Sequence, residues 1–435
     1  MRIIATSDWH LGNLFHGNDR LPEHRHFLQW LLQQLREHRP DALLVAGDVF
    51  DNGNPSAAAQ SAYYEFLADA TQACPDMHII ITAGNHDSAS RIEAPRPLLA
   101  RHKVQVRGMV KRRWQPTDDG GSWVVDYDDL MIPVGDGEGR QLVVLAVPYL
   151  RSDVVQDTDY SRGVGTFLQQ LTARARQRYP GLPLLMMAHL YARGAAIATT
   201  DASEKIVIGG LEEVSMQDWP SHPDYLTCGH IHKRQPVWGT SWARYTGSVL
   251  PMSFAEKDYS HGVDLINFDT ASDDADPHYP SPACHAPTVT HLAYEPQHKL
   301  RILPDDDAEL TPARLKRLIN AELPDLPADG PDDSFEYVML KVKLDKASAD
   351  DVRALEEMVS QKNAVLCKIQ KVMPQLDIAT LNGEQPIASV DDILNRDPMD
   401  TLREAFVIHH QQPLNERQEA LLSDVINSIQ NDSND

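Results

Sequence analysis

The sequence predicts an α/β fold, and two observations carry that prediction. The first 85 residues alternate between short apolar runs and amphipathic stretches, in the order strand, helix, strand, helix, strand. Each apolar run also stops at a small residue or a glycine, followed by side chains that can bind metals or transfer protons. Because α/β sheets place their sites at the carboxyl ends of strands, this pattern indicates a site at one sheet edge.

Hydrophobic periodicity places the elements. Six apolar runs predict β-strands, over residues 2–7, 43–46, 77–81, 141–147, 184–188 and 225–228. Leucines at helical spacing predict a helix over 22–38, which Pro40 ends, and an alanine-rich stretch predicts a second helix over 56–71. The composition of 103–139 predicts irregular structure, and 245–248 is expected to form a tight strand and turn.

Length and composition limit the class of protein. A chain of 435 residues suggests two or three domains. The hydrophobic fraction of 42% and charged fraction of 24% are typical of globular proteins. We expect a cytoplasmic protein, because no run approaches the roughly 18 apolar residues of a membrane span and the apolar start is too short for a signal peptide.

The net charge of −23 argues against a broad basic surface for nucleic acid. A polyanionic substrate would therefore need bound metal ions, local basic patches or a partner. Four cysteines are scattered without a Cys-x-x-Cys pair, so we expect them to be reduced and structural: Cys74, Cys228, Cys284 and Cys367.

Two strand ends supply acidic and imidazole side chains. Asp8 and His10 follow the first strand. Residues two apart in an extended chain point to one face about 6.6 Å apart, so this pair can converge on one ion. A surface aspartate beside a capping histidine is the alternative. Asp48 follows Gly47 at the end of the second strand and is a candidate for a carboxylate that bridges two ions.

The third strand leads into the most informative stretch, Gly84-Asn85-His86-Asp87. An amide, an imidazole and a carboxylate side by side suit metal binding and proton transfer. The same residues also make a good turn, which is the alternative interpretation.

Histidines follow two later strands. His189 comes directly after residues 184–188, where a buried or capping histidine is the alternative. His230 and His232 belong to a Gly-His-x-His motif, in which the glycine permits close approach of the backbone. The alternating pair can reach two ions about 3.5–4 Å apart.

The candidate ligands combine carboxylate, amide and imidazole groups, and they are Asp8, His10, Asp48, Asn85, His189, His230 and His232. This mixture favours manganese, iron or zinc over calcium, and a bridging carboxylate suits two ions. Two adjacent divalent ions stabilise charge on an attacked phosphate, so phosphoester hydrolysis is the predicted reaction. We expect His86 to donate a proton to the leaving alkoxide and Asp87 to orient one of the histidines.

The second half of the chain predicts separate units. Asp-, Pro- and Ser-rich sequence over 270–290 indicates a linker, so we expect domains at 1–280, 281–380 and 381–435. The middle unit is expected to be strand-helix-strand-helix-strand. Its predicted elements include a helix capped by Thr311, a strand at 338–344, a helix at 348–362 and a strand at 364–372. The tail carries a helical apolar face from Asn415, which either serves a partner or packs on its own chain.

Five blocks of the sequence resemble, in their order, the signature of calcineurin-like metallophosphoesterases. They are Asp8-x-His10, Gly47-Asp48, Gly84-Asn85-His86-Asp87, His189 and Gly229-His230-x-His232. Within that superfamily, residues 6–12 and 46–51 are similar to the bacterial SbcD family of nuclease subunits. Protein phosphatases of the superfamily typically have an arginine just after the Gly-Asp loop and a glutamate at the end of the third motif. This sequence has Asp51-Asn52 and Asp87 at those places, which disfavours the phosphatase branch.

The resemblance implies a two-sheet sandwich flanked by helices, a small α+β capping domain that helps select DNA ends, and a C-terminal helical tail that docks on an SbcC-type ATPase. It implies a manganese-dependent double-strand exonuclease and single-strand or hairpin endonuclease, in a homodimer within a heterotetramer, acting in DNA repair and recombination. One ion would take Asp8, His10, Asp48 and His232, and the other Asp48, Asn85, His189 and His230.

Two other functions compete with this interpretation. A stand-alone phosphodiesterase or nucleotidase would use the same metal core on small phosphoesters. A non-catalytic scaffold would hold the ATPase through its tail. No role is assigned to Asp51. The basic and aromatic cluster Lys111-Arg112-Arg113-Trp114 is expected to be a solvated loop, with contact to a phosphate backbone and a base as the alternative.

Overall fold

The structure is a computed structural model that forms two compact units, Met1–Val372 and Met373–Asp435. It describes residues 1–117, 120–135, 139, 141–155, 157–196, 213–216, 219, 221–268, 286–306, 310–327, 334–343, 347–372 and 418–419. Apart from Gln418 and Glu419, which are helical, the expected tail at 381–435 lies outside the described residues.

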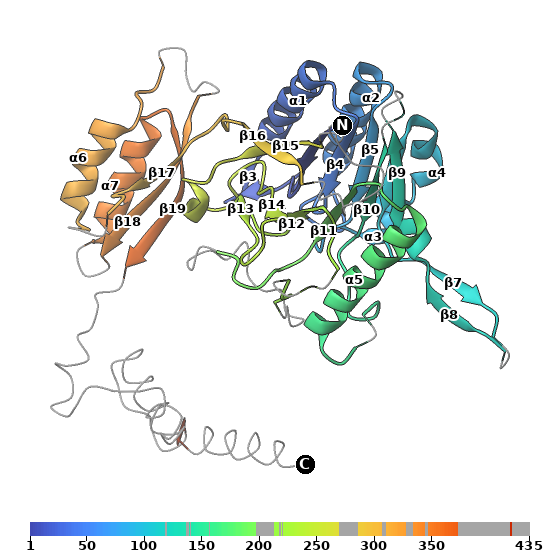
Figure 1. Cartoon of the computed structure of the whole chain (residues 1–435). Helices are drawn as coiled ribbons and strands as arrows, with labels where there is room; N and C mark the ends of the chain where they lie inside the picture. Colours follow the sequence, from blue (N-terminus) through green and yellow to red (C-terminus); the bar gives the residue numbers. More distant parts are fainter. Residues whose placement is uncertain are drawn as a thin grey trace. The chain divides into compact units, whose positions relative to one another are not determined.

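Two six-stranded sheets form the centre of the first unit (Figure 1). The first sheet has the order β16-β15-β1-β4-β5-β6. Its strands are β1 (Arg2–Thr6), β4 (Ala42–Ala46), β5 (His78–Thr82), β6 (Val104–Arg107), β15 (Gly262–Asn267) and β16 (Thr288–Ala293). The first four of these are parallel, and the last two pair antiparallel. The α/β prediction is confirmed, and β16 extends this sheet beyond residue 280.

The second sheet has the order β13-β14-β12-β11-β10-β9. Its strands are β9 (Met131–Gly135), β10 (Gln141–Ala146), β11 (Leu184–His189), β12 (Tyr225–Gly229), β13 (Gln235–Pro236) and β14 (Ala243–Tyr245). The four strands β10, β11, β12 and β14 run parallel. All six strands predicted from the apolar runs are therefore present, three in each sheet.

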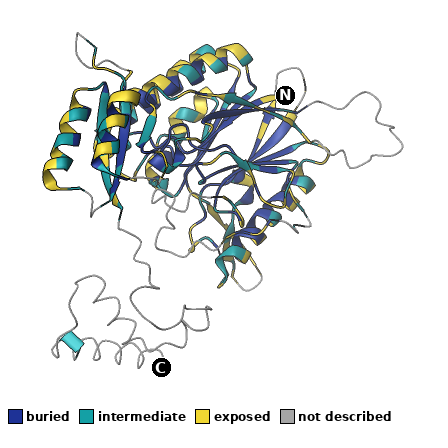
Figure 2. Ribbon diagram, turned by 90° about the vertical axis from the view of Figure 1, so that its left-hand side faces the viewer, coloured by how far each residue is buried: buried dark blue, intermediate teal, exposed yellow. Residues whose placement is uncertain are grey.

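Alternation of side chains divides the core into layers. In β1, Ile3 and Ala5 enter a cluster that also takes residues of the second sheet, such as Val144 and Leu185. Ile4 points the other way, into a cluster with the helices that cover the first sheet. Successive strand residues face opposite sides, so the two sheets share one inner core and each has an outer core. Figure 2 shows these central strands as buried.

Helices cover the outer faces. The first sheet packs against α1 (Leu21–His38) and α2 (Ala57–Ala73), and the second against α5 (Tyr160–Arg178). Both predicted helices are confirmed, whereas α5 was not predicted. Ser56 caps α2 by accepting a hydrogen bond from the Ala59 amide, and Asp159 caps α5 in the same way from the Arg162 amide. This unit also has short helices: α3 (Ala89–Glu93), α4 (Arg96–Leu99), η1 (Ala100–His102), η2 (Tyr127–Leu130) and η3 (Phe254–Glu256).

The prediction of irregular structure over 103–139 is wrong. Besides β6 and β9, this segment forms a two-stranded hairpin of β7 (Arg112–Gln115) and β8 (Ser122–Val125), which extends from the sheets in Figure 1. Trp114 and Trp123 face each other across it with ring centroids 5.7 Å apart. The basic groups contact acids of the same chain, since Lys111 Nζ lies 3.1 Å from Glu93 Oε1. Short strands with exposed charged residues lack the alternation that predicts a half-buried strand.

A smaller sheet follows, in the order β17-β18-β19, with strands β17 (Leu300–Leu303), β18 (Glu336–Lys343) and β19 (Ala364–Val372). Its strands are parallel, and α6 (Pro312–Glu322) and α7 (Ala349–Ser360) pack on one face. The predicted strand and helix order of this unit, including the Thr311 cap, is confirmed. The other face contacts the main body through Tyr337 and Met339, which pack on Phe15 of a short hairpin, β2 (Leu14–Phe15) and β3 (Asn18–Asp19).

Within the part of the chain that the structure describes, no helix is long and apolar enough to cross a membrane. Cys74, Cys228 and Cys367 carry free thiols, as expected, and Cys284 lies outside the described residues.

Candidate metal centre

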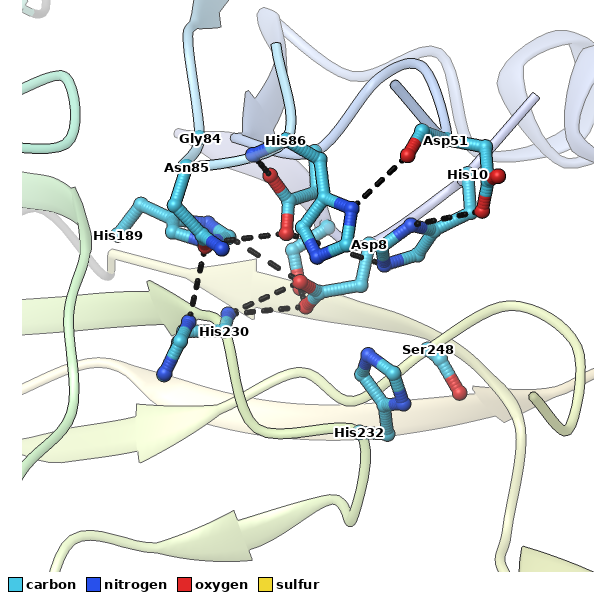
Figure 3. A network of polar contacts seen from close by, with 12 residues as sticks. Asp8, His10, Asp51, Gly84, Asn85, His86, His189, His230, His232 and Ser248 are labelled. Atoms are coloured by element: carbon cyan, nitrogen blue, oxygen red, sulfur yellow. Dashed lines mark hydrogen bonds and ion pairs between the residues drawn. The ribbon is translucent and has the colours of Figure 1, made fainter. Parts of the chain in front are cut away.

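The predicted ligands come together where strands of both sheets end (Figure 3). Asp8, Asp48 and Asn85 follow β1, β4 and β5 of the first sheet, and His189 and His230 come from β11 and the end of β12 in the second. His10 and His232 complete the set, with their ring centroids 5.2 Å apart. One cluster thus draws on five parallel strands, as expected when carboxyl ends of strands meet at one edge.

The backbone at this cluster is strained. Asp8, His10, Asp48 and His230 have positive φ angles of 52°, 47°, 48° and 98°. The extended chain expected at Asp8 and His10 is therefore wrong. The two side chains converge because both residues have the left-handed backbone conformation. Backbone hydrogen bonds hold this loop, from the Asp8 amide to the Gly47 carbonyl (3.1 Å) and from the His10 amide to the Asp48 carbonyl (3.0 Å). Such residues each cost about 1–3 kcal/mol, which the surrounding structure must offset, and they gather at functional sites.

Two glycines permit this close packing. A Cβ at Gly84 would collide with the amide and the carboxylate of Asp48. At Gly229 it would collide with the Ala46 carbonyl and crowd the ring of His189. The glycines of the predicted motifs are thus required by contact between strand ends that are distant in the sequence.

The cluster has two halves, and the first consists of Asp48, Asn85, His189 and His230. His189 lies at its centre. Its Nδ1 donates to the Ala46 carbonyl at 2.9 Å. Its Nε2 lies 2.9 Å from Asn85 Oδ1 and 3.2 Å from Asp48 Oδ2. The same Asn85 oxygen accepts from His230 Nδ1 at 3.0 Å. Since all of these partners are acceptors, the contacts in the metal-free site favour protons on both ring nitrogens of His189 and hence a positively charged ring.

The charges in this half compensate one another. Burial lowers the pKa of His189, but the Asp48 and Asp8 carboxylates outweigh burial and raise it to about 9. In turn, burial would raise the pKa of Asp48, and the charge and hydrogen bond of His189 lower it. Burial also raises the pKa of Asp8, with the Asp48 charge adding to the effect. Two buried carboxylates side by side therefore require positive charge, which divalent cations would supply.

The second half has Asp8, His10 and His232, whose possible ligand atoms all lie within 4.8 Å of one another. Nε2 of His10 is buried without a hydrogen-bond partner, 3.8 Å from Asp48 Oδ2. A buried nitrogen with no partner is unfavourable unless something else binds it. Together with the paired carboxylates, this nitrogen indicates that the residues fit bound divalent metal ions.

His86 lies at the edge of the cluster, half-buried, with its ring centroid 4.8 Å from that of His10. Its Nδ1 donates to the carbonyl of Asp51 at 2.8 Å, and its amide donates to Asp48 Oδ1 at 2.9 Å. His10, Asp48 and His86 also place ligand atoms within 4.8 Å, so the geometry admits a ligand role for His86 as well as a proton-transfer role.

The role expected for Asp87 is wrong. Asp87 is 2% exposed and accepts backbone N–H bonds from Val49 (3.1 Å), Phe50 (3.0 Å) and Gly84 (2.9 Å), and none of its hydrogen bonds involves a histidine. Its carboxylate instead ties the loop after β4 to the loop after β5, and so positions Asp48 and Asn85 through the backbone. The expectation was that this carboxylate orients a histidine, but in the structure both of its oxygens accept from backbone amides.

Two site residues were missed from the sequence. Asp51 Oδ1 lies 3.7 Å from His10 Nδ1 and accepts from Asn13 Nδ2 at 2.8 Å. Glu256 Oε1 lies 3.0 Å from His232 Nδ1. Asp51 was noted in the sequence without an assigned role, whereas no local pattern marks Glu256.

The sandwich of two sheets and the cluster of metal-binding side chains define a metallophosphoesterase. Residues 1–234 match the family model of the calcineurin-like phosphoesterases, and the chain belongs to this family. Within it, the chain belongs to the SbcD group, the nuclease subunits of SbcCD complexes. It is 35% identical to SbcD of Rhodobacter capsulatus over 408 residues, which cover 91% of this chain and 92% of that protein.

Other members of this group match a shorter part of the chain. SbcD of Escherichia coli K12 is 33% identical over 281 residues, covering 62% of this chain and 65% of that protein. SbcD of Bacillus subtilis is 29% identical over 272 residues, covering 61% of this chain and 66% of that protein.

Proposed function

We propose that this chain is the DNA-cleaving component of an SbcCD-type nuclease, with double-strand exonuclease activity and endonuclease activity on single strands and hairpins. The observation that carries the proposal is the cluster in which carboxylates, an amide and imidazoles from five strand ends meet around a buried His10 nitrogen without a partner. The similarity to R. capsulatus SbcD, which extends over 92% of that protein, supports the assignment to DNA rather than small phosphoesters.

We propose two divalent ions, most favourably Mn²⁺, as the cofactor. Asp8, His10, Asp48 and His232 would hold one ion. Asp48, Asn85, His189 and His230 would hold the other, with Asp48 shared. The chemistry that the ions supply when bound is Lewis-acid stabilisation of charge on the phosphate and activation of water. Ion binding at the second set requires that His189 give up its Nε2 proton, because a metal ligand must offer a lone pair.

His86 is the proposed proton donor to the leaving oxygen. The bond from its Nδ1 to the Asp51 carbonyl fixes the ring orientation and leaves Nε2 as the nitrogen that can transfer a proton. The bond from its amide to Asp48 Oδ1 ties the position of this ring to that of the proposed bridging carboxylate. Asp87 supports His86 and Asp48 by holding together the loops that follow β4 and β5.

The proposed partner is an SbcC-type ATPase, bound through the tail at 381–435, in a complex that contains two copies of each chain. The apolar helical pattern from Asn415 supports this docking, because helices with one apolar face bind grooves or other helices. A cytoplasmic location follows from the proposed DNA substrate. With a net charge of −23, the isolated chain is expected to bind DNA weakly and with strong salt dependence, the partner supplying much of the affinity.

The test compares Mn²⁺-dependent cleavage of a linear duplex, a DNA hairpin and a nucleotide ester, each with and without the ATPase partner and ATP. The proposal predicts cleavage of both DNA substrates, stimulated by the partner, and its loss in Asp48→Asn. Efficient cleavage of the nucleotide ester without DNA cleavage would instead support a small-molecule phosphodiesterase. Absence of all three activities alongside partner binding would support a scaffold.

A further inference from the structure

Glu256 is a fully buried carboxylate beside the proposed metal centre, and it lies outside every motif of the metallophosphoesterase signature. It ends the short helix η3 (Phe254–Glu256) and is 0% exposed. Its Oε1 lies 3.0 Å from Nδ1 of His232. The contact joins residues 24 positions apart, so the chain must bring η3 back to the cluster to form it.

This contact decides which nitrogen of His232 can bind a metal. An ionised carboxylate only accepts hydrogen bonds, so Nδ1 donates a proton to it and Nε2 is the nitrogen that can offer a lone pair to a metal. In His189 and His86 the Nδ1 proton goes instead to neutral backbone carbonyls, of Ala46 and Asp51. Of these three histidines, His232 is the one whose Nδ1 bonds to a carboxylate, and that full negative charge raises the basicity of the opposite nitrogen.

The carboxylate is held rigidly. Glu256 Oε2 accepts from the Met252 amide at 2.9 Å, and the Glu256 carbonyl accepts from the Tyr259 amide at 2.9 Å. Its neighbour Phe254 packs against Phe15, with ring centroids 5.3 Å apart, in the cluster that also contacts the small sheet. A side chain fixed at both oxygens and on a packed helix can hold the ring of His232 in one orientation.

We propose that Glu256 is the positioning residue for the metal ion bound by Asp8, His10, Asp48 and His232. It fixes the tautomer and orientation of His232 and strengthens its Nε2 as a ligand through its charge. The inference rests on the proposed function, because it takes His232 to be a ligand. It goes beyond the metal-ligand signature, since the carboxylate comes from a helix that the signature does not include.

The first experiment measures Mn²⁺ binding to the metal-free full-length chain by the electron paramagnetic resonance signal of free Mn²⁺. The variant Glu256→Gln keeps the size of the side chain and removes its charge. We expect the affinity for one of the two ions to fall about 10–100-fold, as for other partners of metal-bound histidines, while the second ion binds as in the wild type. The Mn²⁺ concentration for half-maximal cleavage should rise by a similar factor, with kcat at saturating Mn²⁺ changed much less.

Glu93→Gln is the control, because Glu93 is another buried carboxylate, 8% exposed. It accepts hydrogen bonds from the amides of Gly108 and Met109 and pairs with Arg96 and Lys111 rather than with a proposed metal ligand. Its Mn²⁺ isotherm should match that of the wild type. A Glu256→Gln isotherm identical to the wild-type isotherm would overturn the inference. A wild type that binds no Mn²⁺ would instead overturn the proposed function.

A second measurement needs no substitution at Glu256 and so does not depend on the folding of a variant. Long-range ¹H–¹⁵N correlation spectra of the metal-free wild type report the tautomer of each histidine, and His232→Gln assigns the signal. The inference predicts a proton on Nδ1 of His232, whether or not Nε2 also carries one. A proton on Nε2 alone would contradict it.

Discussion

Oδ2 of Asp48 lies 3.2 Å from Nε2 of His189, and this contact joins the two sheets at the ends of β4 and β11. The pair is buried, and each partner controls the charge of the other, since Asp48 helps to raise the pKa of His189 to about 9. The metal-free site therefore favours a positively charged imidazole ring at the position where the proposed ions would bind. The contact indicates how the two layers of the sandwich are coupled to one charged centre.

Replacement of Asp48 by asparagine removes one negative charge and the proposed bridging ligand. We expect DNA cleavage to fall at least about 100-fold, because metal stabilisation of phosphate charge contributes several kcal/mol. In the metal-free protein, the pKa of His189 should fall from about 9, since its nearest carboxylate is lost while its burial remains. Cleavage assays and an NMR titration of His189 test both effects, and an unchanged His189 pKa would contradict the proposed charge coupling.

Replacement of His86 by glutamine separates proton transfer from metal binding. Loss of a general acid typically slows a reaction about 10²–10⁴-fold. We expect a loss in this range with Mn²⁺ stoichiometry and affinity unchanged, because the proposed ligand set is complete without His86. Titration of bound Mn²⁺ alongside single-turnover cleavage measures the two properties. Parallel loss of one ion and of activity would show that His86 is a ligand, as its approach to His10 and Asp48 allows.

Replacement of Asp87 by alanine leaves the amides of Val49, Phe50 and Gly84 without their buried acceptor. We expect the free energy of unfolding to fall by about 3 kcal/mol or more, since each buried donor left unsatisfied costs about 1–3 kcal/mol. Urea denaturation of the metal-free protein provides the measurement. Asp87→Asn, which retains one acceptor oxygen, should lose less. A stability equal to that of the wild type would be inconsistent with the positioning role.

Buried His24 makes the stability depend on pH. Burial, with the charge of Arg20, lowers the pKa of His24 to about 3, from an ordinary value of about 6.5. Between these values the unfolded chain binds a proton that the folded chain does not. The free energy of unfolding therefore decreases as the pH falls below about 6.5, by up to about 1.4 kcal/mol per pH unit for this group. Burial lowers the pKa of His261 to about 4, which adds to the same trend.

Urea denaturation between pH 7.5 and 5 tests this dependence. His24→Gln should lower the free energy of unfolding at pH 7.5, because the substitution alters the packing. The further decrease in this free energy between pH 7.5 and 5 should be smaller than in the wild type. An equal decline in both proteins would show that His24 does not contribute.

A buried ion pair links the body of the protein to the small sheet. Arg20 and Glu23 are almost fully buried and form bonds of 2.8 and 2.7 Å, and Glu23 Oε1 also accepts from the Tyr337 hydroxyl at 3.2 Å. Removal of one buried partner typically costs about 3–5 kcal/mol, because it leaves the other charge uncompensated. We expect Arg20→Met to lose stability in this range, measured by urea denaturation.

The double variant Arg20→Met with Glu23→Leu supplies the control for that pair. Its loss in free energy of unfolding should be much smaller than the summed losses of Arg20→Met and Glu23→Leu, because no buried charge is left alone. Tyr337→Phe should cost about 1 kcal/mol through its lost hydrogen bond. Additive losses within about 0.5 kcal/mol would show that the two charges do not depend on each other.

The sequence predicted the strands that deliver the site, because their apolar runs end in motifs that local patterns reveal. Asp48, for example, follows a buried strand and a glycine, and both features are visible within six residues. Helix starts at Ser56, Thr311 and Ser348 were equally local, since each cap bonds to an amide three residues on. These features depend on interactions between near neighbours in the chain.

Features that depend on distant packing were not predictable. Strand β15 pairs with β1 across some 260 residues, as in the register of Arg2 with Asn267. The contact of Glu256 with His232 and that of Glu23 with Tyr337 arise only when separate segments fold together. At Asp87 the motif misled, because it suggested a contact with one of the histidines, whereas the carboxylate binds backbone amides of two loops.

The central claim is that the cluster holds two divalent ions on the seven predicted side chains. Anomalous diffraction at the manganese absorption edge, from crystals grown with Mn²⁺, measures this directly. We expect two peaks, one within bonding distance of Asp8, His10, Asp48 and His232, and the other within bonding distance of Asp48, Asn85, His189 and His230. A single peak, or peaks away from Asp48, would contradict it.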